Sequence, residues 1–181
     1  AYGLYGTAVG GILGLVHTAF AGRLGRLGGR GTAAVVALVG FVAAVVVPFL
    51  RYPPNPPAST VEGTVGTRTA ANLVLLAVSI LAAAVAVQLA RRLRPRTGWW
   101  YGTVIAGGGY LMVVVTAAAF LPAVAETPAD FPATVLYDFR IAALAAQVAL
   151  WTAWTLGFAA LLPTSSRSVA TIVPDRHQHD G

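Results

Sequence analysis

The sequence of 181 residues contains neither cysteine nor lysine. Without cysteine, the chain forms no disulfide, no thiolate zinc site and no iron–sulfur cluster, and it has no thiol for redox chemistry. Without lysine, it has neither the P-loop lysine of an ATP-hydrolysing motif nor an amine for Schiff-base chemistry. Any energy from ATP would therefore have to come from another subunit.

Charged residues are also scarce, at 10% of the chain against 57% hydrophobic residues, and the mean hydropathy is positive. A soluble domain of this size could not bury so much apolar surface in a single core. Segments of about 10 residues with alternating hydrophobicity, which a membrane β-barrel would need, are not seen. The composition therefore predicts a helical membrane protein.

Five apolar segments are long enough to cross a hydrocarbon core of about 30 Å as helices, which takes about 20 residues each. They are residues 2–21, 32–50, 70–90, 101–121 and 141–162. We predict an all-α fold, a polytopic membrane helix bundle with about five transmembrane helices and short loops over residues 1–162. The polar segment 163–181 is predicted to be a disordered tail.

The net charge of +6 is distributed unevenly over the connections. The first and third, residues 23–31 and 91–98, hold seven arginines and no acid. The second and fourth, residues 51–69 and 122–140, hold three arginines and four acids, and the charges of the tail cancel. The positive-inside rule predicts that loops 23–31 and 91–98 and the tail are cytoplasmic and that the other two loops are external. Anionic membrane lipid explains these arginines without nucleic-acid binding.

Glycine recurs in two places inside the apolar segments. Gly6, Gly10 and Gly14 lie four residues apart, a spacing that lets two helices approach closely in lipid. The stripe can serve packing within the chain or a homo-oligomer contact. Residues 107–109 are all glycine, which indicates either an unwound point or a tight helix crossing. Pro48, near the end of the second segment, predicts a kink.

Several polar residues fall where lipid is expected. An ionisable group such as His17 is costly inside a membrane, so His17 is a candidate for a cation path, although a hydrogen bond to a neighbouring helix is the alternative. His177 and His179 could bind a transition metal loosely or be solvated in the tail. Five other polar side chains are predicted to bind neighbouring helices: Asn72, Ser79, Gln88, Thr116 and Gln147.

The external loops carry the acids that could meet a cation. Asp138 and Arg140 are two residues apart and so do not face each other on a helix, which means that each needs a partner elsewhere. Carboxylate oxygens suit a hydrated divalent cation, and the alternative is a set of rim salt bridges that tie the loops together. The Gly-x-Ser-x-Gly, His-Glu-x-x-His and Gly-x-Gly-x-x-Gly motifs do not occur, so we do not expect an enzyme.

Three stretches of the external loops, "VPFLRYPPNPPAS", "VGTRTA" and "FLPAVAETPADFPATVLYDFR", form one extended motif. Together they resemble the CbtA-type family of proposed cobalt transporter subunits of bacterial membranes. The resemblance covers nearly the whole chain. The matching positions are Pro48, Arg51, Tyr52, Pro53, Asn55, Pro56, Pro57, Arg68, Thr69, Pro122, Asp130, Phe131, Pro132, Phe139 and Arg140.

The resemblance implies a multi-pass subunit of a bacterial or archaeal cytoplasmic membrane that transports cobalt or another divalent cation, with no bound cofactor expected. It also implies a small CbtB-type partner subunit. Family members carry an additional N-terminal helix and an external segment rich in acids and histidines, and this sequence, which begins with Ala1, has neither. A processed or truncated chain would account for that difference.

We therefore expect the proline-rich loop to pack against the second external loop and form the outer vestibule of a cation path. Asp130 and Asp138 would face the cation, Asn55 would donate an oxygen ligand, and His17 is a further candidate. The expected structural counter-charges are Arg51, Arg68 and Arg140. Two other functions stay open, a membrane scaffold that does not transport and a membrane enzyme with an external acidic site.

Overall fold

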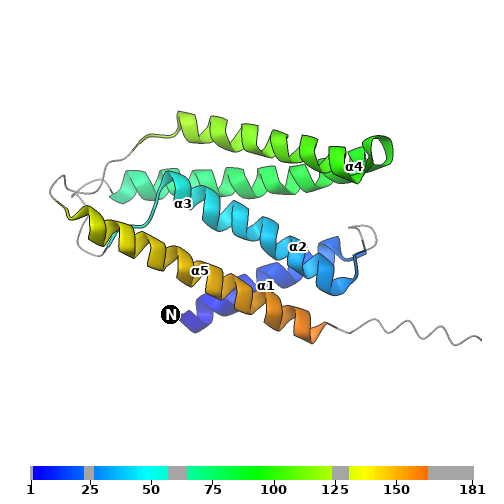
Figure 1. Cartoon of the computed structure of the whole chain (residues 1–181), viewed down its shortest axis with the longest axis horizontal. Helices are drawn as coiled ribbons and strands as arrows, with labels where there is room; N and C mark the ends of the chain where they lie inside the picture. The colour runs from blue at the N-terminus through cyan, green and yellow to red at the C-terminus, as the bar shows by residue number, and fades with distance from the viewer. Residues whose placement is uncertain (1, 23–26, 57–64, 124–130, 163–181) are drawn as a thin grey trace, which may run out of the picture.

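The computed structural model describes residues 2–22, 27–56, 65–123 and 131–162. Within these ranges the chain is helical and forms no strand, which confirms the predicted all-α fold (Figure 1). The elements in chain order are α1 (Tyr2–Phe20), α2 (Gly29–Phe41), the π-helix η1 (Val42–Val46), α3 (Val47–Arg51), α4 (Val65–Phe120) and α5 (Ala133–Leu161).

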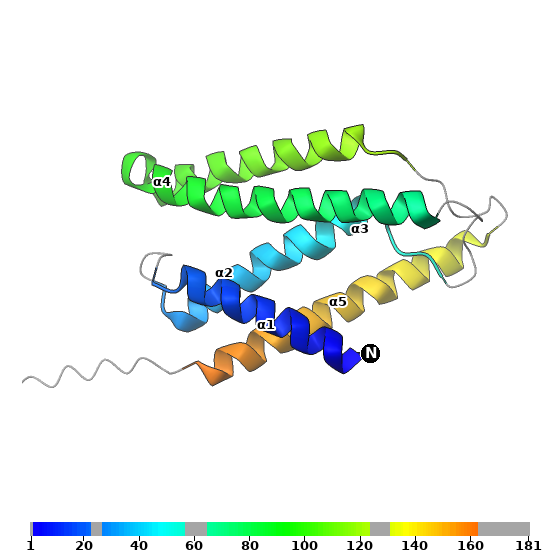
Figure 2. The same ribbon diagram turned by 180° about the vertical axis from the view of Figure 1, so that it is seen from behind.

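Helix α4 is a hairpin of two helical arms. As one straight helix its 56 residues would extend about 84 Å, far beyond a hydrocarbon core. At Gly98 the backbone takes φ 79° and ψ 171°, which glycine adopts without steric penalty, and the chain turns back so that the two arms lie side by side (Figures 1 and 2). Near the turn, a Cβ added to Gly102 would lie 3.3 Å from the Ala90 carbonyl oxygen, so the arms pack closely. The predicted segments 70–90 and 101–121 are these two arms.

The second predicted segment forms one continuous helical stretch through α2, η1 and α3. Its hydrogen bonding changes just before Pro48, where the N–H of Val47 donates to the carbonyl of Val42, five residues earlier. Proline has no N–H, and its ring collides with the carbonyl four residues before it. The disturbance predicted at Pro48 therefore takes the form of a short π-helical stretch.

Three segments of the described chain are long and apolar enough to cross a membrane: Gly29–Arg51, Val65–Phe120 and Ala133–Leu161. Because Val65–Phe120 turns back at Gly98, it accounts for two of the predicted crossings. Helix α1 adds a shorter apolar segment, Gly10–Phe20. The protein is therefore a membrane helix bundle, as the sequence predicts.

The helices run between two ends of the molecule (Figures 1 and 2). One end, called the proline end here, holds the last residues of α3, the segment 52–56, the beginnings of α4 and α5, and the end of α4. The opposite end, called the turn end, holds the end of α1, the beginning of α2, the turn at Gly98 and the end of α5. Loops predicted to share one side of the membrane thus border the same end.

The aromatic side chains of α5 pack against glycines of α1 and α2. A Cβ added to Gly6 would lie 4.0 Å from the Trp154 ring, and one added to Gly14 would lie 3.8 Å from Phe158. At Gly40 of α2 the added Cβ would lie only 3.0 Å from the ring of Trp151. The stripe therefore packs against α5 of the same chain at Gly6 and Gly14, whereas a Cβ added to Gly10 would meet nothing within 4 Å.

The glycines at 107–109 lie in an unbroken part of the second arm of α4. A Cβ added to any of the three would meet no other described atom within 4 Å. The segment is therefore neither unwound nor at a tight crossing with another described helix, and both interpretations of the sequence were wrong here.

Candidate functional site

A segment without regular secondary structure, residues 52–56, crosses the proline end between α3 and α4 (Figure 1). Prolines lack the backbone N–H, and extended proline-rich backbone makes no internal hydrogen bonds. The carbonyl oxygens of the segment therefore need donors from elsewhere, because an unpaired buried polar group is costly.

Arginines from two other helices supply those donors. Arg68, in the first arm of α4, donates a hydrogen bond from its NH2 group to the carbonyl of Pro53. Arg140, in α5, donates from Nε to the Pro54 carbonyl at 3.4 Å and from NH2 to Oδ1 of Asn55 at 3.0 Å. Arginine suits this task because its guanidinium carries five N–H donors in a planar fork and no acceptor.

The start of the segment is fixed to the other arm of α4. Arg51 donates from NH2 to the Leu121 carbonyl at 2.7 Å, and the hydroxyl of Tyr52 donates to the Pro122 carbonyl at 2.8 Å. Both acceptors lie just beyond the end of α4, where helix carbonyls lack intrahelical partners and the helix dipole favours a positive charge. Arg51, Arg68 and Arg140 together are called the arginine clamp below.

Tyr52 anchors the segment in the largest buried cluster at this end. Its side chain is 7% exposed and packs with Ala71 and Leu75 of the first arm of α4. Ala117, Ala118 and Leu121 of the second arm pack against the same cluster. One aromatic side chain therefore joins the proline segment to both arms.

Two of the three clamp arginines have partners that differ from the expected ones. Arg51 and Arg140 form hydrogen bonds to neutral carbonyl and amide oxygens, whereas counter-charge pairing with carboxylates was expected. Asp138 is exposed and makes no hydrogen bond or ion pair to another described residue. The other acids of the external loops, Glu62, Glu126 and Asp130, lie outside the described residues.

The predicted site residues fall into separate groups. Asn55 and Arg140 are bonded to each other, and Asp138 lies two residues before Arg140 on the exposed side of α5. Phe131 and Pro132 lead into α5, with Pro132 at its N-cap, and Pro53 and Pro56 belong to the proline segment. Pro57, His177 and His179 lie outside the described residues.

His17 is not part of this group, because it lies in the last turn of α1 at the turn end. It is 5% exposed, its Nε2 is 3.1 Å from the carbonyl oxygen of Gly29, and its ring packs edge-on against Phe158 at 5.0 Å. This is the hydrogen bond to a neighbouring helix that the sequence left as one alternative. Across residues 2–22, 27–56, 65–123 and 131–162, no three histidine, aspartate or glutamate side chains lie together in a way that could hold a metal ion.

Of the other polar side chains expected to join helices, Ser79 does so. It is fully buried, and its hydroxyl lies 2.9 Å from the hydroxyl of Tyr110 in the opposite arm of α4. Gln88 instead accepts a hydrogen bond from Arg91 in the same helix, so the expectation for Gln88 was wrong. Tyr110 was missed because the sequence gives no sign of which arm residue faces Ser79.

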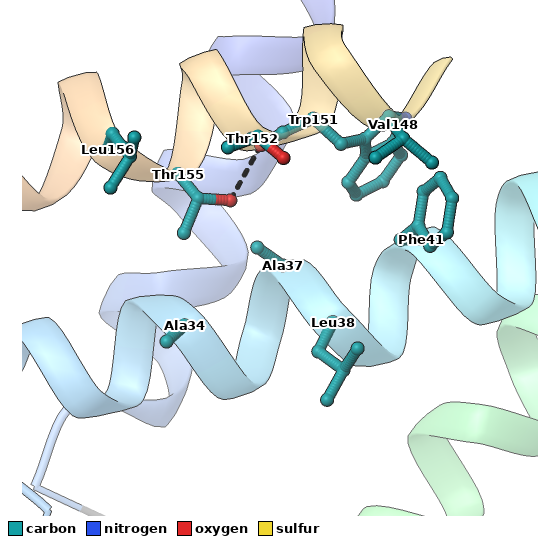
Figure 3. A pocket seen from close by; sticks show the side chains of 9 residues that line it. All are labelled: Ala34, Ala37, Leu38, Phe41, Val148, Trp151, Thr152, Thr155 and Leu156. Atoms are coloured by element: carbon teal, nitrogen blue, oxygen red, sulfur yellow. Dashed lines mark hydrogen bonds between the residues drawn. The ribbon is translucent and has the colours of Figure 1, made fainter. Parts of the chain in front are cut away.

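Two pockets beside α5 differ in chemical character. One, of about 250 Å³ between α2 and α5, is lined mainly by apolar groups such as Leu38, Phe41 and Trp151 (Figure 3). The hydroxyl of Thr155 in it donates to the carbonyl of Trp151 at 2.7 Å, so it is already bonded within its own helix (Figure 3). The other pocket, of about 430 Å³, adjoins the arginine clamp, and its mixed lining includes the polar side chains of Arg68, Thr69, Asn72 and Gln147; it is called the polar pocket below.

Residues 1–163 match the model of the family described as "Probable cobalt transporter subunit (CbtA)". The chain belongs to the CbtA family. No curated protein and no solved structure matches it. As a CbtA-family protein with membrane-spanning helices, it is a membrane subunit of a probable cobalt transporter. The family description supports cobalt as the transported substrate.

The family assignment bears on the other functions that the sequence left open. It favours a transporter subunit over a non-transporting scaffold and over a membrane enzyme with an external acidic site. The word subunit also implies that this CbtA-family chain acts with other subunits. The clamp and the polar pocket lie together at the proline end of the described chain.

Proposed function

We propose that the proline end is the outer mouth of a divalent-cation path and that the turn end faces the cytoplasm. The CbtA family supplies the substrate, cobalt or a similar cation. The distribution of arginines supplies the orientation, because the connections that border the turn end carry seven arginines and no acid. The cytoplasmic membrane of a bacterium or archaeon is the setting that this orientation requires.

The observation that carries the proposal is the convergence of the arginine clamp on backbone oxygens at this end. Arg51, Arg68 and Arg140 come from three helices, α3, α4 and α5, and together with Tyr52 they hold the proline segment across the helix ends. A rigid segment fixed at several points keeps the mouth in one shape, which lowers the cost of ordering it around a cation.

The charge balance of the mouth depends on its acids. Each guanidinium keeps its positive charge when it bonds to a neutral oxygen, so the clamp by itself repels a cation. The two external loops contain four acids against these three arginines, a net charge of −1. We assign the cation-facing role to Asp138 and Asp130, whose carboxylates suit a hydrated divalent ion.

Asn55 has a different role in this proposal from the one expected at first. Its Oδ1 accepts a hydrogen bond from Arg140, so we assign it the role of positioning the clamp. His17 lies at the other end of the molecule and takes no part in the mouth. A small CbtB-type subunit is proposed as the partner that completes the transporter.

The test is cobalt uptake by Asp138→Asn in proteoliposomes, compared with the wild type at equal protein and equal orientation. Removing the negative charge at the mouth lowers the local cation concentration, so we expect a several-fold slower initial uptake at low ionic strength and a smaller difference at high salt. Asp175→Asn, with the same change of charge in the C-terminal segment, is the matched control. Uptake by Asp138→Asn at the wild-type rate would refute the assignment.

A further inference from the structure

The polar pocket of about 430 Å³ lies directly beside the arginine clamp. Arg68 belongs to both, and Tyr52 and Pro54 of the proline segment also line the pocket. The rest of the lining comes from η1 and α3, the first arm of α4, and α5. The pocket therefore occupies the position where a path from the outer mouth would enter the bundle.

One oxygen atom of a residue that lines the pocket has no partner within the described part of the chain. Oε1 of Gln147, on α5, is buried and accepts no hydrogen bond within the described part of the chain. A membrane interior has no bulk water to satisfy such an atom, and unsatisfied buried polar groups in native structures are rare. The amide oxygen therefore calls for a donor or a cation that residues 2–22, 27–56, 65–123 and 131–162 do not supply.

A second oxygen is left without its usual donor on the opposite wall. Pro48 has no N–H, so the carbonyl of Ala44, four residues earlier, lacks its α-helical donor, and the π-helical hydrogen bond from Val47 to Val42 lies next to this site. Ala44 and Pro48 both line the pocket. Short π-helical stretches inside α-helices frequently occur at functional sites.

The remaining polar groups come from α4. Thr69 and Asn72 are three residues apart, so they lie on the same face of the first arm, and both line the pocket. Hydroxyl and amide oxygens are hard ligands that suit divalent cations and their water shells. An anion, by contrast, would be repelled by the partial negative charge of these oxygens.

We propose that this pocket is an intramembrane binding site for the transported divalent cation, which enters it with much of its water shell. Gln147, Asn72 and the carbonyl of Ala44 are the oxygen groups that contact the ion or its water. The inference rests on the function proposed above and deepens it by naming the site behind the mouth. Six water molecules at about 30 Å³ each occupy roughly 180 Å³, so a hydrated ion fits in the pocket.

The site binds its ion weakly, and the lining explains why. No carboxylate is among the residues that line this described pocket, and the guanidinium of Arg68 adds a positive charge at its edge. A transported ion has to leave as readily as it enters, so a site of neutral oxygens suits conduction better than a tight chelate. A carboxylate placed in the pocket should convert it into a trap.

The experiment measures binding and transport separately on the full chain. Equilibrium binding of radioactive cobalt to the protein in lipid nanodiscs is compared for the wild type, Gln147→Glu and Gln147→Leu. We expect Gln147→Glu to bind cobalt at least tenfold more tightly and to transport it more slowly, because the ion no longer leaves readily. Gln147→Leu removes the oxygen ligand, so both binding and uptake should fall.

Two further variants serve as an alternative test and as a control. Asn72→Asp puts the same new charge on the opposite wall and should also tighten binding, which keeps the test decisive if Gln147→Glu misfolds. Gln88→Glu is the matched control, because Gln88 is exposed and lies outside the pocket, bonded to Arg91. Thermal unfolding and gel filtration of each variant establish that it is folded.

The outcomes separate this inference from the proposed function. If the wild type transports cobalt while Gln147→Glu, Asn72→Asp and Gln147→Leu all bind cobalt like the wild type, the pocket holds only water, and the inference is refuted although the transport function stands. If Gln147→Glu tightens binding while Asp138→Asn transports normally, the pocket is supported and the proposed mouth is refuted. Tightening by Gln88→Glu as strong as by Gln147→Glu would also refute the pocket.

Discussion

Tyr52 shows how a single side chain connects the proline segment to the bundle. Its ring is buried among residues of both α4 arms, and its hydroxyl donates to the Pro122 carbonyl at 2.8 Å. The neighbouring Arg51 guanidinium lies 5.6 Å from the centre of the same ring, a favourable cation–π distance, and donates to the Leu121 carbonyl. Packing, a hydrogen bond and a cation–π contact thus meet at one residue.

Changing Tyr52 to phenylalanine should lower stability without changing the fold. The ring stays in its cluster, but the Pro122 carbonyl loses its donor, which typically costs about 1 kcal/mol and lowers the melting temperature by about 2–4 °C for a chain of this size. Thermal unfolding in detergent micelles measures the effect. Tyr101→Phe is the control, because Tyr101 is 65% exposed. Equal melting temperatures for Tyr52→Phe and Tyr101→Phe would contradict the role of the hydroxyl.

At the scale of residues, the sequence identified the participants at the proline end but not their partners. Arg51, Tyr52, Asn55, Arg68 and Arg140 were all singled out from the motif. Their acceptors are mostly backbone carbonyls, and a carbonyl carries no side-chain signature that would show which arginine it meets. Opposite charges offered the obvious pairing, so carboxylates were expected beside Arg51 and Arg140, which bind neutral oxygens instead.

At the scale of elements, α4 depends on a single conformational exception. Its two arms are antiparallel because Gly98 takes a positive φ of 79°, which other residues reach only with strain. The pairing of Ser79 with Tyr110 then joins the arms farther along. The turn, and not the sequence of either arm, determines that the arms pack against each other.

Gly98→Ala and Gly108→Ala should therefore change stability in opposite directions. Alanine at position 98 is forced to φ 79° and ψ 171°, a region essentially confined to glycine, which costs about 1–3 kcal/mol. Alanine at position 108 lies in an unbroken helix where its Cβ meets nothing within 4 Å, so its higher helix propensity should stabilise the protein by up to about 1 kcal/mol.

Chemical or thermal unfolding in micelles measures the change in the free energy of unfolding for Gly98→Ala and for Gly108→Ala. A destabilising Gly108→Ala would mean that the face of residues 107–109 is covered by something other than this chain. A Gly98→Ala protein as stable as the wild type would contradict the turn geometry.

The extent of the elements was predicted well where apolar runs define it and less well elsewhere. The range 2–21 became Tyr2–Phe20, where the apolar run ends before the arginines of the first connection. Helix α5, predicted to begin at 141, begins at Ala133, since Asp138 and Arg140 end the apolar run but do not end a helix. The π-helical stretch had one visible signal, Pro48, and the sequence did not show how the helix would absorb it.

At the scale of the whole molecule, charge and structure agree on two distinct ends. The turn end also has its own arginine contact, in which Nε of Arg30 donates to the carbonyl of Ala159 in the last turn of α5 at 3.1 Å. Trp99, Trp100 and Tyr101 are exposed just after the Gly98 turn, at the level where aromatic residues meet lipid headgroups.

The orientation can be tested by thiol labelling, because the chain has no cysteine and each introduced thiol is the only one. Ala133→Cys lies at the proline end and Arg94→Cys at the turn end, and both positions are exposed. In intact cells, a membrane-impermeant maleimide should label Ala133→Cys and should reach Arg94→Cys only after the membrane is opened. The reverse pattern would contradict the proposed sidedness.

Cobalt transport by this chain is tested most directly by the initial rate of radioactive cobalt uptake into proteoliposomes. It is measured with this chain alone and with its small partner subunit, in competition with nickel, zinc and magnesium. If the chain transports cobalt, we expect cobalt accumulation above that of protein-free liposomes, reduced by excess unlabelled cobalt more than by magnesium. No cobalt flux in any combination, with the protein folded and correctly oriented, would contradict cobalt transport by this chain and favour the non-transporting scaffold.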